Sequence, residues 1–156
     1  MLLGIISDTH KDITYIRKAM DKLKAMDLII HLGDNVEDVK EIGRSFKGEI
    51  ISVRGNCDFS NKIPSERILV LEGKKLLITH GHKYSVKDNL LKLHYRALEL
   101  GVDLVLYGHT HVSKIDFEDG IFFVNPGSTT FPKNGLNSVA SIVISEGKIN
   151  PNIIKI

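Results

Sequence analysis

The chain has 156 residues, which is enough for one domain with a buried core, and its formal net charge is only +2. Near-neutral charge argues against a nucleic-acid coat or a polybasic membrane tether. Cys57 is the single cysteine, so an intrachain disulfide and a cysteine-based zinc site are excluded. Residues 1–6 are apolar but have no basic leader, and no stretch approaches the roughly 20 apolar residues that span a bilayer. We expect one domain, residues 1–156, in the reducing cytoplasm.

Apolar runs of strand length alternate with amphipathic stretches through the first two thirds of the chain. Helices are predicted there by apolar side chains at helical spacing, and Gly101 is expected to end the third helix. The apolar runs are largely continuous, which is typical of strands buried on both faces. The predicted strands are residues 2–6, 28–32, 50–53, 76–78 and 102–107, and the predicted helices are residues 15–23, 36–46 and 90–98. This order indicates βαβ units around a largely parallel sheet.

The last third of the chain reads as strands joined by short turns. Residues 118–120 and 146–148 are typical hairpin connections, and Gly73 suggests a further hairpin before it. Pro151 restricts the last strand to a sheet edge because proline lacks the N–H group. The predicted strands are residues 115–117, 121–124, 139–144 and 149–154. A parallel part followed by an antiparallel part predicts an α/β fold in which two sheets pack face to face, with helices outside.

Polar residues, usually beside glycine, follow five of the predicted strands. The carboxyl ends of strands in an open α/β sheet line one edge, where ligands bind, so these residues should converge. Adjacent glycines allow the backbone to turn sharply there. The segments are Asp8-Thr9-His10, Gly33-Asp34-Asn35, Gly55-Asn56-Cys57-Asp58, His80-Gly81-His82 and Gly108-His109-Thr110-His111.

These segments supply aspartate, asparagine and histidine side chains, a mixture that suits Mn, Fe, Zn, Co or Ni better than a pure oxygen site would. Two aspartates, one asparagine and four histidines from these segments make seven candidate ligands, which are too many for one ion and about right for two. An aspartate such as Asp34 could bridge the two ions. Two metals roughly 3.5–4 Å apart clamp a phosphoryl group and activate a water between them. The sequence therefore predicts a binuclear centre for phosphate-ester chemistry.

In this order, Asp8-x-His10, Gly33-Asp34, Gly55-Asn56, His80 and Gly108-His109-x-His111 resemble the calcineurin-like metallophosphoesterase superfamily. The short chain and its Asn125-Pro126-Gly127-Ser128 turn are most similar to the compact bacterial and archaeal phosphodiesterase branch. The resemblance implies a four-layer α/β sandwich with two divalent metal ions per chain, with Mn expected and Ni, Fe, Co, Zn or Mg as alternatives. It assigns Asp8, His10 and His111 to the first metal, Asp34 as the bridge, and Asn56, His80 and His109 to the second.

The residue that protonates the leaving group is not evident. Cys57 stands where many superfamily enzymes have histidine, and an unperturbed thiol is a poorer acid near neutrality than imidazole. We expect weak protonation, which would favour esters with good leaving groups. Asp58 and His82 are the substitute candidates, although Asp58 could only brace its loop and His82 could support a ligand or be solvated. Asn35 and Asn56 are candidate substrate contacts, with a turn role as the alternative for Asn35.

The leading hypothesis is a phosphodiesterase in which a hydroxide bridging two metals attacks the phosphorus of a small phosphodiester. A phosphomonoesterase or a nuclease is the nearest alternative, and the near-neutral charge counts against the nuclease. A metal-bound protein-interaction scaffold is the alternative from another class. No membrane or nucleic-acid partner is expected. Exposed hairpin edges leave a homodimer open, and His31, inside an apolar run, is expected to be structural.

Overall fold

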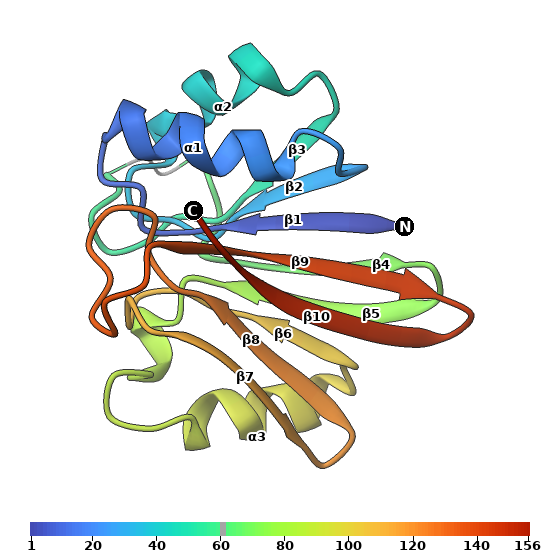
Figure 1. Ribbon diagram of the computed structural model, residues 1–156. Helices are drawn as coiled ribbons and strands as arrows, with labels where there is room; N and C mark the ends of the chain where they lie inside the picture. The colour runs from blue at the N-terminus through green and yellow to red at the C-terminus, as the bar shows by residue number, and fades with distance from the viewer. Residues whose placement is uncertain (60–61) are drawn as a thin grey trace.

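The computed structural model describes residues 1–59 and 62–156. In this part of the chain ten strands form two five-stranded sheets that pack face to face, and three α-helices cover their outer faces (Figure 1). The predicted α/β fold with two mixed sheets is confirmed. None of the helices in these residues is both long and apolar enough to cross a membrane.

The first sheet combines three parallel strands with an antiparallel hairpin. β1, β2 and β3 are parallel, and β9 pairs antiparallel to β1 and to β10. Pro151 lies in β10 opposite Ile142, at the edge of the sheet, as the sequence predicts. In the order β10-β9-β1-β2-β3 the strands are Lys148–Lys155, Ser138–Ser145, Leu2–Ile6, Leu28–His31 and Glu49–Ser52.

The second sheet has parallel strands at its centre and an antiparallel strand on each side. β5, β6 and β8 are parallel to one another, whereas β4 runs antiparallel to β5 and β7 antiparallel to β8 at the two edges. The parallel and antiparallel parts of the sequence therefore do not correspond to the two sheets, because each sheet draws strands from both. In the order β4-β5-β6-β8-β7 the strands are Glu66–Leu71, Lys74–Thr79, Leu104–Leu106, Ile121–Pro126 and Ser113–Glu118.

The helices follow the predicted apolar stripes. α1 begins after Asp12, whose side chain accepts hydrogen bonds from the N–H groups of Thr14 and Tyr15. α3 ends at Gly101, which has a φ of 60° and so adopts the left-handed conformation that glycine permits. The predicted second helix is divided into a 3₁₀ turn, Val36–Asp38, and α2. The α-helices are Ile13–Leu23 (α1), Val39–Ser45 (α2) and Leu91–Leu100 (α3).

Three apolar clusters separate the four layers. One lies between the sheets and includes Leu3, Ile5 and Leu76. A second joins the first sheet to α1 and α2 and includes Ile6, and a third joins the second sheet to α3. Leu3 and Ile5 thus face one layer and Ile6 another, which explains why β1 is apolar at successive positions. The sandwich leaves the loops that follow the parallel strands free to carry polar side chains.

Candidate metal centre

Two groups of three side chains lie in the loops at the carboxyl ends of β1, β2, β5 and β6. Within each group, one carboxylate oxygen and two imidazole nitrogens lie within 4.8 Å of one another. Each group contains residues from both sheets, so the two sheets meet at a common edge, as the sequence predicts. The groups are Asp8, His10 and His111, and Asp34, His80 and His109.

The two groups adjoin each other at His80. Its Nε2 atom lies 3.4 Å from Asp34 Oδ1 and 4.0 Å from Asp8 Oδ1. Facing imidazole nitrogens approach within each group, with His80 Nε2 at 3.2 Å from His109 Nδ1 and His10 Nε2 at 3.4 Å from His111 Nε2. The nitrogens and carboxylate oxygens therefore point toward shared positions rather than toward water.

Backbone carbonyl groups fix the orientation of two of these histidines. His80 donates its Nδ1–H to the carbonyl oxygen of Leu32, and His111 donates its Nδ1–H to that of Phe131, both at 2.8 Å. Each bond places the proton on Nδ1 and leaves Nε2 directed into its group. Histidine ligands of metals are typically oriented in this way by a carbonyl or a carboxylate.

Asp8 presents one carboxylate oxygen that no hydrogen bond satisfies. Its Oδ2 atom accepts hydrogen bonds from Ser7 Oγ at 2.6 Å and from the His109 N–H group at 3.1 Å. Oδ1 is buried and has no hydrogen-bond partner among the described residues, although His111 Nε2 lies 3.1 Å away. A buried, unsatisfied carboxylate oxygen is costly unless a cation binds it. With imidazole nitrogens beside it, the donor set fits a divalent metal ion.

The charges of the two carboxylates suit cation binding. Burial alone would raise the pKa of Asp8, but His111 and His80 lower it below its ordinary value. The pKa of Asp34 is lowered in the same way, since the contact with His80 outweighs its burial. Burial, reinforced by the charge of His80, lowers the pKa of His109 to about 4, so this imidazole is neutral and able to bind a metal. Both carboxylates are therefore ionised near neutral pH.

The backbone at the two groups is mostly left-handed, which is uncommon for residues other than glycine. All six members except His80 have positive φ angles. Aspartate and histidine tolerate this conformation better than most side chains, and such outliers cluster at functional sites. The φ angles are 54° at Asp8, 45° at His10, 59° at Asp34, 68° at His109 and 60° at His111.

Two glycines are required by close approaches of the loops. A Cβ atom at Gly55 would lie 2.1 Å from Asp34 Oδ1, and one at Gly108 would lie 2.2 Å from Ser7 Oγ. Neither position has room for a side chain without displacing Asp34 or the contacts of Asp8. The glycines noted in the sequence therefore let four loops approach one another in two pairs at the candidate metal centre.

Asp58 joins the loop after β2 to the loop after β3. Its Oδ2 atom accepts hydrogen bonds from the N–H groups of Asp34 at 2.9 Å and Gly55 at 2.8 Å, and Oδ1 accepts one from Val36 at 2.8 Å. The same loop places the Cys57 N–H group 2.9 Å from Asp34 Oδ1. Asp58 thus braces these loops, which is the structural role that the sequence left open.

The remaining candidates lie around the two groups. The His82 ring centroid is 5.5 Å from that of His80 and 6.1 Å from that of His109, and His82 Nδ1 is buried without a hydrogen-bond partner among the described residues. Burial, together with the contact with Asp34, raises the pKa of the Cys57 thiol to about 11, so the thiol stays protonated near neutral pH. Asn56 is exposed beside Cys57, and its role stays a prediction.

The sequence predicted a turn at Asn125-Pro126-Gly127-Ser128, but Asn125 and Pro126 are the last residues of β8, and the segment supports the loops of the centre. Asn125 Nδ2 donates to the carbonyl oxygen of Gly108 at 2.9 Å, which holds the loop of His109 and His111. Ser128 Oγ donates to the carbonyl oxygen of Asp8 at 2.8 Å. Both side chains are fully buried. The polar side chains in this segment were the available signal, but their partners are more than 15 residues distant in the chain.

His31 belongs to a second buried support. Its Nδ1 atom accepts the Gly33 N–H group at 3.2 Å, and its Nε2 atom lies 3.2 Å from Thr9 Oγ1. Thr9 Oγ1 also donates to Asp38 Oδ2 at 2.5 Å. Burial lowers the pKa of His31 to about 4, which keeps the ring neutral. This arrangement accords with the structural role expected for His31, because both ring nitrogens have partners within the protein.

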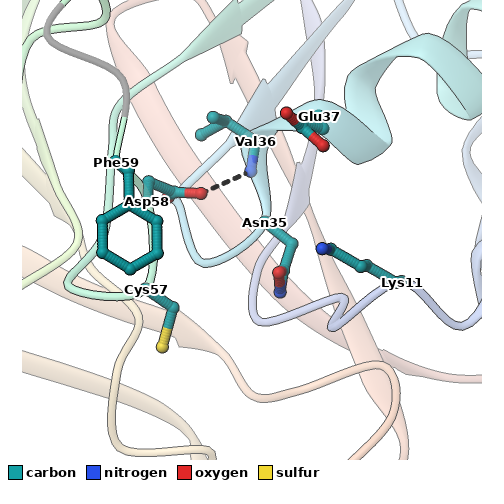
Figure 2. Close-up of a pocket in the computed structure, with 7 residues that line it drawn as sticks. All are labelled: Lys11, Asn35, Val36, Glu37, Cys57, Asp58 and Phe59. Carbon is teal, nitrogen blue, oxygen red and sulfur yellow. Dashed lines mark hydrogen bonds between the residues drawn. The ribbon is translucent and has the colours of Figure 1, made fainter.

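A pocket of about 330 Å³ lies beside Asp34. Two of its lining residues adjoin Asp34: Asn35 follows it in the chain, and the Cys57 N–H group donates a hydrogen bond to Asp34 Oδ1. Figure 2 shows the Lys11 side chain extending toward Asn35, with the Phe59 ring on the other side. Asn35 and Asp58 thus line a cavity, whereas His82 lies beside His80 and His109. The pocket is lined by Lys11, Asn35, Val36, Glu37, Cys57, Asp58 and Phe59.

Comparison with known proteins gives the family. A probable metallophosphoesterase of Methanocaldococcus jannaschii is 36% identical over 161 residues, covering 100% of this chain and 82% of the relative. A phosphodiesterase of the same organism is 32% identical over 146 residues, covering 81% of this chain and 83% of the relative. The crystal structure of a Streptococcus pneumoniae protein that is described as a predicted phosphoesterase superposes with a TM-score of 0.83 at 28% identity, covering 99% of this chain and 88% of that one. The family model of the calcineurin-like phosphoesterase superfamily domain matches residues 1–147, and this chain belongs to that family.

Proposed function

We propose that the protein is a binuclear metal-dependent phosphodiesterase that acts as one domain. The observation that carries this proposal is the pair of adjoining Asp-His-His groups. Asp8, His10 and His111 would hold one ion, and His80, His109 and Asn56 the other, with Asp34 between them. We infer Mn²⁺ as the metal, with Ni, Fe, Co, Zn or Mg as alternatives, because the ligands mix imidazole and carboxylate groups.

A pair of divalent ions, when bound, supplies positive charge for a phosphoryl group and lowers the pKa of water toward neutrality. The protein's own contribution is orientation. Leu32 and Phe131 hold His80 and His111 with Nε2 directed inward, and Ser7 holds Asp8 with Oδ1 free. Lys11 and Asn35 lie at the adjacent pocket, where they would contact the substrate.

His82 is the better placed of the two candidate proton donors. Both oxygens of Asp58 already accept backbone N–H groups, whereas His82 Nδ1 has no partner among the described residues. Burial, with the positive charges of His80 and Lys83, lowers the pKa of His82, so little of the imidazole carries the proton that a general acid must donate at pH 7. This agrees with the expected preference for esters with good leaving groups.

The proposal is tested by removing metal with a chelator, restoring Mn²⁺ and following hydrolysis of bis-p-nitrophenyl phosphate. We expect about two Mn²⁺ per chain and turnover that is lost in Asp34→Asn. Asp21→Asn, at an exposed carboxylate on α1, is the matched control and should retain turnover. Binding of two metals without turnover of diesters or monoesters would instead support the protein-interaction scaffold.

We also infer the substrate class, the cellular location and the oligomeric state of the enzyme. A small phosphodiester remains the proposed substrate, without a nucleic-acid or membrane partner. The cytoplasm remains the proposed location because the single cysteine suits a reducing compartment. A homodimer through a sheet edge stays a prediction, which sedimentation velocity would test.

A further inference from the structure

The pocket beside Asp34 is placed to receive part of a substrate. Its wall is formed by Asn35, which follows Asp34, and by Cys57, whose N–H group donates to Asp34 Oδ1 at 2.9 Å. A phosphoryl group at the candidate metal centre would therefore have one ester arm at the entrance of this pocket. Its volume of about 330 Å³ is at the lower end of the range for small-molecule sites.

Phe59 gives the pocket a flat apolar surface. Its side chain is 96% exposed, the largest exposure among the exposed large hydrophobic residues that the structure describes. The ring is attached one residue beyond Asp58, whose carboxylate is held by the backbone N–H groups of Asp34, Val36 and Gly55. The chain beside Phe59 is therefore tied to the loop that carries Asp34. An aromatic ring so placed is suited to stacking against a planar group.

The polar lining of the pocket contains both donors and acceptors of hydrogen bonds. Lys11 offers donors, Glu37 offers acceptors and the Asn35 amide offers both (Figure 2). Lys11 and Glu37 are exposed, and neither forms a salt bridge in the part of the chain that the structure describes. The lining has one positive side chain, Lys11, and two carboxylates, Glu37 and Asp58, so it does not favour a second phosphate. It favours an arm without negative charge that has a polar edge and hydroxyl groups.

We propose that this pocket binds a nucleoside arm of a small phosphodiester, with the base stacked on Phe59 and the polar edges contacted by Asn35, Lys11 and Glu37. The proposal rests on the proposed phosphodiesterase function and narrows its substrate class. An aromatic heterocycle with a sugar combines a planar face, hydrogen-bond donors and acceptors, and the absence of negative charge, which together suit this lining.

The test compares two ligands that share a phosphate and a ribose but differ in the base. Binding of adenosine 5′-monophosphate and of ribose 5-phosphate to the Mn²⁺-loaded protein is measured by isothermal titration calorimetry. We expect the nucleotide to bind about tenfold more tightly, as stacking of one base on an aromatic side chain provides. Phe59→Ala should remove this difference, and Phe59→Trp should restore it.

Tyr95→Ala is the matched control, because Tyr95 is another exposed aromatic residue but lies on α3, which covers the second sheet. It should leave the difference between the two ligands unchanged. Equal binding of the two ligands to the wild type, absence of binding by both, or a preference that survives Phe59→Ala would overturn the proposal.

Hydrolysis of bis-p-nitrophenyl phosphate separates this proposal from the function on which it rests. Turnover without a preference for the nucleotide would overturn the nucleoside pocket and leave the phosphodiesterase intact. A preference that depends on Phe59 without turnover of any ester would support the pocket and overturn the phosphodiesterase.

Discussion

The hydroxyl group of Ser128 donates a hydrogen bond to the carbonyl oxygen of Asp8, 120 residues earlier in the chain. The same hydroxyl oxygen accepts the N–H groups of Thr130 and Phe131. Phe131 in turn supplies the carbonyl oxygen that orients His111. The buried side chain of Ser128 therefore links the backbone at Asp8 to the segment that orients His111.

Ser128→Ala should weaken both the fold and metal binding. The substitution leaves buried backbone groups without a partner, which costs about 1–3 kcal/mol of the free energy of unfolding. Urea denaturation measures this loss, and calorimetry should show weaker Mn²⁺ binding. Ser145→Ala, at an exposed position at the end of β9, is the control. Equal Mn²⁺ affinity in Ser128→Ala and the wild type would contradict the assigned role.

Gly55→Ala should disrupt the centre, whereas Gly43→Ala should not. The new Cβ atom at position 55 would displace Asp34, since it would lie 2.1 Å from Oδ1 and 2.7 Å from the backbone nitrogen. We expect a loss of about tenfold or more in Mn²⁺ affinity. Gly43 lies in α2, and its Cβ atom would approach other atoms no closer than 4.0 Å. Alanine there should raise the free energy of unfolding by about 0.5–1 kcal/mol. Comparable Mn²⁺ affinities in the two variants would refute this account.

His31 should make stability depend on pH in the acidic range. Its pKa is about 4 in the fold, against 6.5 as the ordinary value, because burial disfavours the charged ring. The unfolded chain therefore binds the proton more readily, and stability is lost as pH falls from 6.5 to 4. The loss due to this residue should reach roughly 3 kcal/mol.

The measurement is the free energy of unfolding of the wild type and of His31→Gln at several pH values, each in the presence of chelator. The difference between the two proteins isolates His31 from the other histidines. Parallel pH profiles for the two proteins would show that His31 does not carry this dependence.

His82→Gln should impair esters with poor leaving groups most. A dialkyl phosphodiester needs a proton on the departing oxygen, whereas a nitrophenyl ester needs it much less. General-acid catalysis typically contributes about 10²–10⁴-fold, and because His82 is mostly unprotonated at pH 7 we expect a loss near the lower end, about 10²-fold, for the dialkyl ester. Phosphorus NMR follows that reaction, and absorbance follows the nitrophenyl ester. His94→Gln, on α3, is the control. Equal losses on both esters would exclude His82 as the proton donor.

Metal binding should stabilise the fold. An ion present at 100 times its dissociation constant adds about 2.7 kcal/mol per site. For a domain of this size that corresponds to a rise in Tm of about 5–10 °C per ion. Scanning calorimetry with Mn²⁺ and with chelator measures the shift, and Asp8→Asn should reduce it. A Tm that is independent of Mn²⁺ at saturating concentration would contradict the presence of the centre.

The sequence predicted the positions of the candidate ligands because each one follows an apolar run. Asp8, Asp34, His80 and His109 all come within three residues of a strand end, and the carboxyl ends of parallel strands meet at one edge. The assignment of strands to sheets was not predictable in the same way. A strand buried on both faces has the same apolar pattern in either sheet, so β2 and β6 could not be assigned to their sheets by composition.

The contacts that hold the centre were also beyond sequence reasoning. Asn125 and Ser128 act through partners distant in the chain, and nothing in their own segment identifies those partners. The left-handed backbone at His109 and His111 depends on the packing of neighbouring loops, since histidine adopts that conformation only occasionally. His31 was predictable as structural because it lies inside an apolar run.

Because each group takes residues from both sheets, neither part of the chain contains a complete ion-binding set. A fragment of residues 1–59 would carry Asp8, His10 and Asp34, and a fragment of residues 62–156 would carry His80, His109 and His111. The first fragment alone lacks three of the imidazole ligands, and the second alone lacks both carboxylate ligands. Metal capture would thus report reassociation of the two fragments, and the protein could serve as a split reporter whose signal is the reunited centre.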